Sequence, residues 1–183
     1  MRTFIAIETN QKVREITQSI VEKLTRRRFI ATWVKPENVH LTLFFLGEIT
    51  EEIASQICER LKKRLLGFPS FHLEVGGFGY FRGRNGRPRV FWLGVKEDQR
   101  LLMLYREILN ELRKFSFEFP DSFTPHITIG RVKSVPPKWK SLVSDLEYET
   151  IILPVDGINV YSSVLTPDGP IYSVFSEIKF EGG

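Results

Sequence analysis

Two short segments that share one residue pattern constrain the fold of this chain more than any other feature. Residues 40–43 read His-Leu-Thr-Leu, and residues 126–129 read His-Ile-Thr-Ile. Successive side chains of a strand point to opposite faces of a sheet, so the aliphatic residues can pack in a core while histidine and threonine share the other face. A helix-like stretch precedes each segment. The sequence therefore predicts two similar αβ halves packed face to face.

Hydrophobic periodicity divides the chain into helices and strands with no linker between them. Apolar residues at helical spacing predict helices over residues 11–27, 50–66 and 98–115, and Asn10 and Thr50 are in position to cap the first two. Strands are predicted over residues 3–8, 39–46, 71–81, 89–95, 124–133, 149–164 and 171–180. Turns or breaks fall at 35–38, 135–137 and 166–170. We therefore expect one α+β domain over residues 1–183, with two antiparallel sheets flanked by helices.

The charge of the chain is compatible with a polyanionic partner. The formal net charge is +4, and arginines gather at residues 26–28 and again in the stretch 82–89. Solvated basic turns and a surface that follows a phosphate backbone both fit this pattern. The single cysteine excludes an internal disulfide, and the apolar runs are too short to span a bilayer. We expect a cytoplasmic protein with no membrane partner.

The two histidine–threonine pairs carry the groups that acid–base chemistry at a phosphate needs. A threonine hydroxyl can donate a hydrogen bond to a phosphate oxygen. An imidazole titrates near ~6.5, so one histidine can be neutral and another protonated, as a general base and a general acid must be. One such segment alone is more often structural, but its repetition favours a site made by His40 and His126 together. The third histidine, His72, alternates with apolar residues beside Glu74 and is expected to face solvent.

Longer stretches around these segments resemble a known family. Residues 33–48, 123–131 and 161–172 are similar to the first motif block, the second motif block and the closing segment of the 2H phosphoesterase superfamily. The similarity is to its RNA 2′,3′-cyclic phosphodiesterase branch, historically named 2′-5′ RNA ligase, and covers essentially the whole chain. It implies a bilobal fold with a pseudo-twofold, in which two antiparallel sheets line a central groove and helices lie outside. One departure is Phe44, which stands where the family often has a polar or basic residue.

The resemblance also implies an activity. Members of this branch hydrolyse 2′,3′-cyclic phosphate at RNA ends to 2′-phosphate without a metal or other cofactor, and some join or cleave 2′,5′-linked RNA halves. For this chain the resemblance implies His40 as the general acid and His126 as the general base, although the sequence itself is symmetric on this point. Thr42 and Thr128 are expected to hold the non-bridging phosphate oxygens. The implied substrate is RNA, with tRNA halves among the candidates, and we expect a monomer.

Two further residues are candidates for substrate contact. Arg131 suits a phosphate or a base, but strict alternation puts it on the face opposite His126, so this role requires a bulge. By the same alternation Phe44 shares a face with His40, and we expect it either to stack on a terminal base or to pack at the edge of the core. Weaker candidates are Trp33, Tyr161 and Ser163.

Other functions stay open at the level of sequence. An RNA-binding module without catalysis would use the same basic loops and aromatic residues, but it gives no reason for two histidine–threonine pairs. Small cyclic nucleotides and ADP-ribose cyclic phosphate are alternative substrates for an enzyme. A metal-dependent hydrolase is disfavoured because the chain has no His-x-x-x-His, no pair of cysteines and no dense acidic cluster with histidine. No phosphate-binding loop is present either, so we expect neither a metal nor a cofactor.

Overall fold

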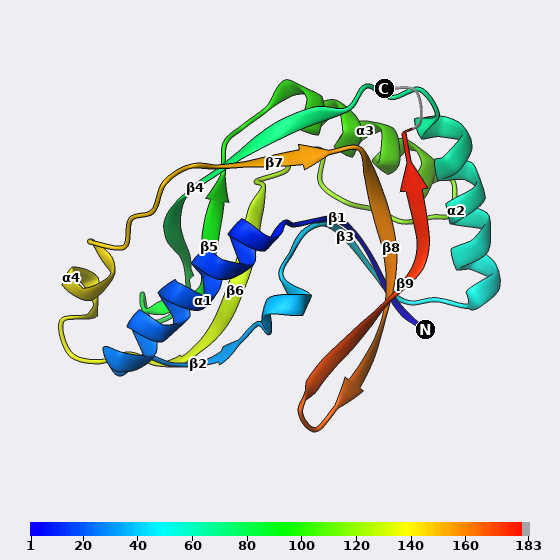
Figure 1. Cartoon of the computed structure of the whole chain (residues 1–183). Helices are drawn as coiled ribbons and strands as arrows, with labels where there is room; N and C mark the ends of the chain where they lie inside the picture. Colours follow the sequence, from blue (N-terminus) through cyan, green and yellow to red (C-terminus); the bar gives the residue numbers. More distant parts are fainter. Residues whose placement is uncertain (181–183) are drawn as a thin grey trace.

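The computed structural model describes residues 1–180, which form two antiparallel sheets with helices packed on their outer sides (Figure 1). Sheet A has the strand order β3-β1-β8-β9, and sheet B has the order β2-β6-β5-β4-β7. The strands of sheet A are β1 (Arg2–Glu8), β3 (His40–Glu48), β8 (Gly157–Thr166) and β9 (Gly169–Lys179). Those of sheet B are β2 (Ile30–Trp33), β4 (Phe71–Arg82), β5 (Pro88–Val95), β6 (His126–Ser134) and β7 (Ile151–Val155). The α+β architecture predicted from the sequence is confirmed.

Three long helices begin at a side chain that caps their first turn. The carboxamide of Asn10 accepts from the backbone N–H of Val13 at 3.1 Å, as predicted, and Thr50 accepts from Ile53 at 3.2 Å. Such caps satisfy backbone donors that the first turn leaves free. The helices are α1 (Gln11–Arg26), α2 (Glu51–Leu65) and α3 (Gln99–Arg113), with a 3₁₀ helix η1 (Pro36–Asn38) and the short α4 (Trp139–Val143). Within residues 1–180 no helix has the length and hydropathy that a membrane crossing requires.

One hydrophobic core extends from sheet A to sheet B beneath the helices. The aliphatic residues of both histidine segments belong to it, since Leu41, Ile127 and Ile129 are fully buried. The strands that carry the histidines, β3 and β6, also contact each other. Because the core holds one face of each strand, their histidine and threonine side chains are turned to the opposite face.

Three elements differ from the sequence prediction. The short strand β2 and helix α4 were not predicted, because neither is long enough to show a hydrophobic period. The stretch 149–164, predicted as one strand, is two strands that belong to different sheets. The chain changes sheet at Asp156 and Gly157, where a Cβ on Gly157 would lie 2.5 Å from the carbonyl oxygen of Ile178. Glycine permits this close approach of two backbones, and local alternation does not register the change of sheet.

The β8–β9 hairpin curls sheet A back toward the segment that leads into β3. In Figure 1 the tip of this hairpin projects at the bottom of the view. The side-chain amide of Asn38, in η1, donates to the carbonyl of Pro170 at 2.9 Å. The hairpin therefore meets the chain two residues before His40.

Candidate active site

Both histidine strands carry a β-bulge at the third residue after the histidine. In sheet A, Thr42 pairs with Ala6 and Phe44 pairs with Ile5, so Leu43 is the extra residue. In sheet B, Thr128 pairs with Trp92 and Gly130 pairs with Phe91, so Ile129 is the extra residue. A bulge of this kind reverses the alternation of faces beyond it. The two halves thus repeat a backbone irregularity as well as a sequence pattern.

Because of the first bulge, Phe44 does not lie on the histidine face, where simple alternation places it. Its side chain is only 1% exposed and lies in the core, stacked on Tyr105 with a centroid separation of 4.5 Å. The next residue, Phe45, follows Thr42 on the histidine face of β3. It is 70% exposed, and its ring centroid lies 6.0 Å from that of Phe4. Phe44 therefore packs in the core, and Phe45 is the exposed aromatic residue that alternation did not identify.

The second bulge brings Arg131 to the face that carries His126. Arg131 pairs with Val90, which shares a face with Trp92 and hence with Thr128. The Arg131 side chain is exposed. Its charge and that of Arg2 both act to lower the pKa of Tyr172, against the larger effect of burial, which raises it. Arg131 in sheet B is thus close enough to influence a tyrosine of sheet A.

His40 lies in a box of aromatic rings. Its ring centroid is 4.5 Å from that of Tyr161, 5.8 Å from that of Tyr172 and 6.2 Å from that of Phe4, and the residue is 8% exposed. Burial, with a smaller contribution from the charge of Arg14, lowers the pKa of His40 to about 4. A charged imidazole is disfavoured where water is excluded. His40 is therefore neutral at neutral pH in the free protein.

Each histidine is oriented by the backbone carbonyl two residues before it. Nδ1 of His40 lies 2.9 Å from the carbonyl oxygen of Asn38, and Nδ1 of His126 lies 2.9 Å from that of Thr124. A carbonyl only accepts, so Nδ1 must carry the proton in both rings. Where such a ring is neutral, Nε2 is left with its lone pair, free to take a proton from a bound molecule.

His126 has a more open environment than His40. It is partly exposed, and its ring meets the edge of Phe81 at 4.9 Å and 85°. Phe81 is itself 38% exposed and lies 5.5 Å from Trp92. One histidine of the pair is therefore enclosed by aromatic rings, while the other remains accessible to water.

The threonines of both segments keep their hydroxyls free. Thr42 and Thr128 are partly exposed, and neither hydroxyl has a hydrogen-bond partner among residues 1–180. Threonines elsewhere differ, since the hydroxyl of Thr17 donates to a helix carbonyl at 2.8 Å. The free hydroxyls suit an anion that carries oxygen acceptors.

Two charged residues beside His40 were not identified from the sequence. Glu8 is the cross-strand partner of His40 on β1, and a guanidinium nitrogen of Arg14 lies 3.7 Å from the Glu8 carboxylate. Nε of Arg14 is buried and has no hydrogen-bond partner in the described part of the chain. Only the pairing of β1 with β3 brings these residues to His40, so no local sequence signal marks them.

The remaining sequence candidates make no contact with either histidine in the described part of the chain, although Ser163 is the cross-strand partner of Tyr172. His72 is exposed, as predicted, and Trp33 stacks on the buried Phe91 at 6.3 Å. Ser163 pairs with Arg2 on the neighbouring strand. In the described residues no three His, Cys, Asp or Glu side chains gather as a metal site would require.

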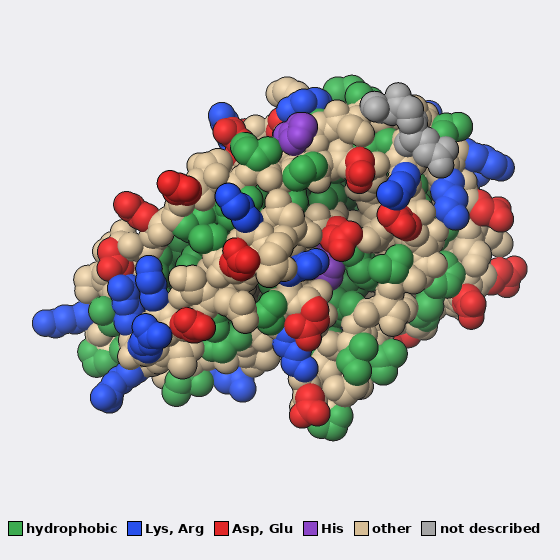
Figure 2. Space-filling model, viewed as in Figure 1, with side chains coloured by type: hydrophobic (Ala, Val, Ile, Leu, Met, Phe, Trp, Pro, Cys, Tyr) green, Lys and Arg blue, Asp and Glu red, His purple; other side chains and the backbone are tan. Residues whose placement is uncertain are grey.

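The first arginine cluster is engaged in a structural contact. Arg27 makes two hydrogen bonds to the carboxylate of Asp145, at 2.6 and 3.0 Å, and a third to the carbonyl of Leu142. Figure 2 shows Lys and Arg side chains gathered at the end of the molecule where α1 ends and α4 lies. Arg27 therefore links the end of α1 to α4 and to the residues that follow α4.

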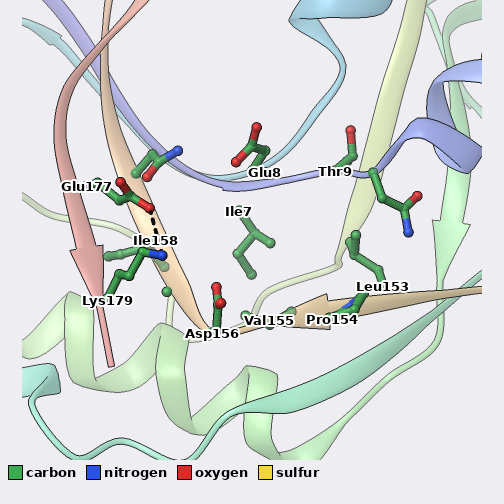
Figure 3. A pocket seen from close by; sticks show the side chains of 13 residues that line it. Ile7, Glu8, Thr9, Leu153, Pro154, Val155, Asp156, Ile158, Glu177 and Lys179 are labelled. Atoms are coloured by element: carbon green, nitrogen blue, oxygen red, sulfur yellow. Dashed lines mark ion pairs between the residues drawn. The ribbon is translucent and has the colours of Figure 1, made fainter. Parts of the chain in front are cut away.

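A hollow of about 240 Å³ lies at the end of β1 and the junction of β7 with β8 (Figure 3). Its walls carry the carboxylates of Glu8, Asp156 and Glu177. One of these, Glu177, is paired with Lys179 at 3.5 Å. The hollow is thus predominantly acidic.

Comparison with known proteins agrees with this arrangement. The family model described as LigT-like phosphoesterase matches the chain twice in succession, over residues 7–92 and 93–172. Each match contains one of the two histidine segments, which accords with the two similar halves that the sequence predicted.

The similarity to relatives and to solved structures covers nearly the whole chain. A Thermotoga maritima protein named RNA 2′,3′-cyclic phosphodiesterase is 55% identical over 183 residues, covering 100% of this chain and 97% of the relative. An Archaeoglobus fulgidus protein of the same name is 36% identical, covering 94% and 96%. The crystal structure of a Thermus thermophilus protein superposes with a TM-score of 0.78 at 28% identity, covering 100% and 99%. That of E. coli LigT complexed with 3′-AMP has a TM-score of 0.71 at 25% identity, covering 98% and 97%. With this double match and these identities over nearly full length, the chain belongs to the LigT-like phosphoesterase family.

Proposed function

We propose that this protein is a phosphodiesterase that hydrolyses 2′,3′-cyclic phosphate at RNA ends to 2′-phosphate, with His40 and His126 as its acid–base pair. The observation that carries the proposal is the matched presentation of two imidazoles. Each donates Nδ1–H to a backbone carbonyl at 2.9 Å and leaves Nε2 free beside an unengaged threonine hydroxyl. The name shared by the Thermotoga and Archaeoglobus relatives supports the reaction and the substrate.

In this mechanism one water molecule attacks phosphorus opposite the 3′ oxygen. The bond from the water oxygen to phosphorus forms while the bond from phosphorus to the 3′ oxygen breaks. Nε2 of the base takes a proton from the water, and Nε2 of the acid gives one to the departing oxygen. The hydroxyls of Thr42 and Thr128 donate to the non-bridging oxygens, where negative charge develops. Arg131 lies on the face of His126 and adds positive charge there.

We assign His40 as the acid and His126 as the base, the roles that the resemblance to the 2H phosphoesterases implies. The enclosed imidazolium of His40 is a strong proton donor, because burial lowers its pKa to about 4. The negative charge of a bound phosphate would favour protonation of His40 once the substrate is in place. His126 is open to solvent and can meet the attacking water. A 2′,5′ linkage would form if the 5′ hydroxyl of a second RNA strand attacked phosphorus in place of water, with the same roles for both histidines, and cleavage of that linkage would use them in exchanged roles.

The decisive test uses a short RNA with a 2′,3′-cyclic phosphate end, in the presence of a chelator and without nucleotide. We expect the wild-type protein to produce a 2′-phosphate end, and His40→Ala and His126→Ala each to lose about 10²- to 10⁴-fold in rate. The matched control is His72→Ala, which removes the exposed third histidine and should retain full activity. Near wild-type rates in either active-site variant would refute the assignment.

The alternative functions give different results in the same assay. A binding module would retain the RNA and leave its cyclic end intact in the wild type. An enzyme for small cyclic nucleotides would hydrolyse 2′,3′-cyclic AMP but not the RNA end. For the active enzyme we expect a cytoplasmic monomer that acts on RNA, with tRNA halves among its substrates.

A further inference from the structure

Four arginines occupy the turn between β4 and β5 and its flanks. They are Arg82, Arg84, Arg87 and Arg89, all exposed. The backbone of the turn is held by its own hydrogen bonds, from Gly83 to the carbonyl of Arg87 at 2.8 Å and from Gly86 to that of Gly83 at 3.1 Å. We call this segment, residues 82–89, the arginine hairpin. The side chain of Asn85 also accepts from the backbone N–H of Arg87 at 3.1 Å, so the turn is closed without any of the four guanidinium groups.

Several arginines elsewhere in the molecule are paired with acidic residues. Arg60 is paired with Glu111 at 2.8 Å, and Arg113 is paired with Asp121 at 2.7 Å. Within residues 1–180 no ion pair involves an arginine of the hairpin; the guanidinium of Arg82 lies instead 5.9 Å from the ring centroid of Tyr80. Four positive charges without acidic partners on one turn favour the binding of a polyanion.

The hairpin continues the histidine face of sheet B. Along β6 this face presents His126, Thr128 and, because of the bulge, Arg131. Arg131 is paired through Val90 with Phe81, the residue before the hairpin. Phe81 also contacts the ring of His126 at 4.9 Å. A continuous path of aromatic and basic side chains therefore leads from His126 to the arginines.

The hollow near the opposite end of β4 carries the opposite charge. β4 begins at Phe71, which pairs with Val155 beside the acidic hollow, and ends at Arg82. The hollow presents Glu8, Asp156 and Glu177 (Figure 3). A polyanion held at the histidines is repelled from this end and attracted to the hairpin.

From this arrangement we propose that the arginine hairpin binds the RNA strand on the 5′ side of the cyclic end and so makes an oligonucleotide a better substrate than a cyclic mononucleotide. The inference rests on the proposed function, because it takes the cyclic phosphate to lie between His40 and His126. The hairpin begins directly after Phe81, whose ring contacts that of His126. Its arginines are therefore placed to meet phosphates of the nucleotides that precede the terminal one. Aromatic contact from Phe81 and charge from the arginines are the elements by which single strands are held without regard to sequence.

The test compares two substrates and two double variants. The substrates are 2′,3′-cyclic AMP and a five-nucleotide RNA that ends in the same cyclic nucleotide. The variants are Arg84→Ala/Arg87→Ala and a matched control, Lys62→Ala/Lys63→Ala, which removes two exposed charges from α2. We expect the hairpin variant to lose about 5- to 30-fold in kcat/KM for the oligonucleotide and to stay within about twofold for the mononucleotide. The control should leave both values near those of the wild type.

A salt series gives a second reading of the same contact. For a single strand, the logarithm of affinity falls with the logarithm of salt concentration by ~0.7 for each phosphate contact. The hairpin variant should therefore show a shallower slope than the wild type with the oligonucleotide and the same slope with the mononucleotide. Equal losses on both substrates, or none on the oligonucleotide, would overturn the inference. Failure of the wild type to hydrolyse either substrate would instead refute the proposed function.

Discussion

The side-chain amide of Asn38 donates to the carbonyl of Pro170, 2.9 Å away, and joins the segment before β3 to the tip of the β8–β9 hairpin. The backbone carbonyl of the same residue accepts from Nδ1 of His40. Asn38 thereby links the orientation of His40 to the hairpin, which also carries Tyr161 and Tyr172. Nothing equivalent is present at Thr124, whose carbonyl orients His126 without a side-chain hydrogen bond in the described chain. We infer that Asn38 is a positioning residue for His40.

Substitution of Asn38 should lower turnover without much effect on substrate affinity. Asn38→Asp keeps the size of the side chain but cannot donate when ionised, so the hairpin is released and His40 loses its fixed setting. We expect kcat to fall about 10- to 100-fold, because small displacements of a catalytic group have effects of this size. KM should change little. The pKa of His40, followed by NMR, should rise toward its ordinary value as water enters, and an unchanged pKa with unchanged kcat would contradict the positioning role.

The enclosure of His40 predicts a specific dependence of stability on pH. The pKa of His40 is lowered to about 4 in the folded protein, whereas the unfolded chain takes up this proton near ~6.5. Stability is therefore fully present above ~6.5 and is lost as the pH falls toward 4, by roughly 3 kcal/mol in all. Urea unfolding of the wild type and of His40→Gln, at pH 7.5 and pH 4.5, isolates this contribution from that of the carboxylates. Parallel losses in the two proteins would show that His40 does not titrate in this way.

Because of the bulge at Leu43, replacement of two adjacent phenylalanines should change the free energy of unfolding by very different amounts. Phe44→Ala opens a cavity beside Tyr105 and should lower the free energy of unfolding by about 3–5 kcal/mol. Phe45→Ala removes an exposed side chain and should change it by less than about 0.5 kcal/mol. If Phe45 meets the base of the substrate, its removal raises KM by about fivefold with kcat preserved. Chemical unfolding and steady-state kinetics on the same preparations check both statements, and a strong destabilisation by Phe45→Ala would place the bulge elsewhere.

A substrate with sulfur in place of the 3′ bridging oxygen should separate the acid from the base. A thiolate leaves without a proton, so the reaction no longer needs the general acid. We expect His40→Ala to regain most of the wild-type rate on this substrate, while His126→Ala remains about 10²-fold or more below it. Rescue of His126→Ala alone would assign the two histidines in the reverse order.

Features that depend on local pattern could be predicted from the amino-acid sequence alone. The caps at Asn10 and Thr50, the three long helices and the repeated histidine segments each lie within a short stretch, where the period of apolar residues is visible. The same repetition marks His40 and His126 as a pair. The two antiparallel sheets follow from the number and spacing of the strand segments.

The side chains that surround these histidines, in contrast, depend on how the strands pair. The bulges at Leu43 and Ile129 are defined by pairing with β1 and β5, and they turn Phe44 into the core and Arg131 toward His126. The change of sheet at Gly157 likewise depends on a neighbouring strand. Glu8 and its partner Arg14 reach His40 through the pairing of β1 with β3. Asn38 meets Pro170 because the β8–β9 hairpin folds toward it. Cross-strand register and long-range hydrogen bonds join residues far apart in sequence, so local periodicity carries no record of them.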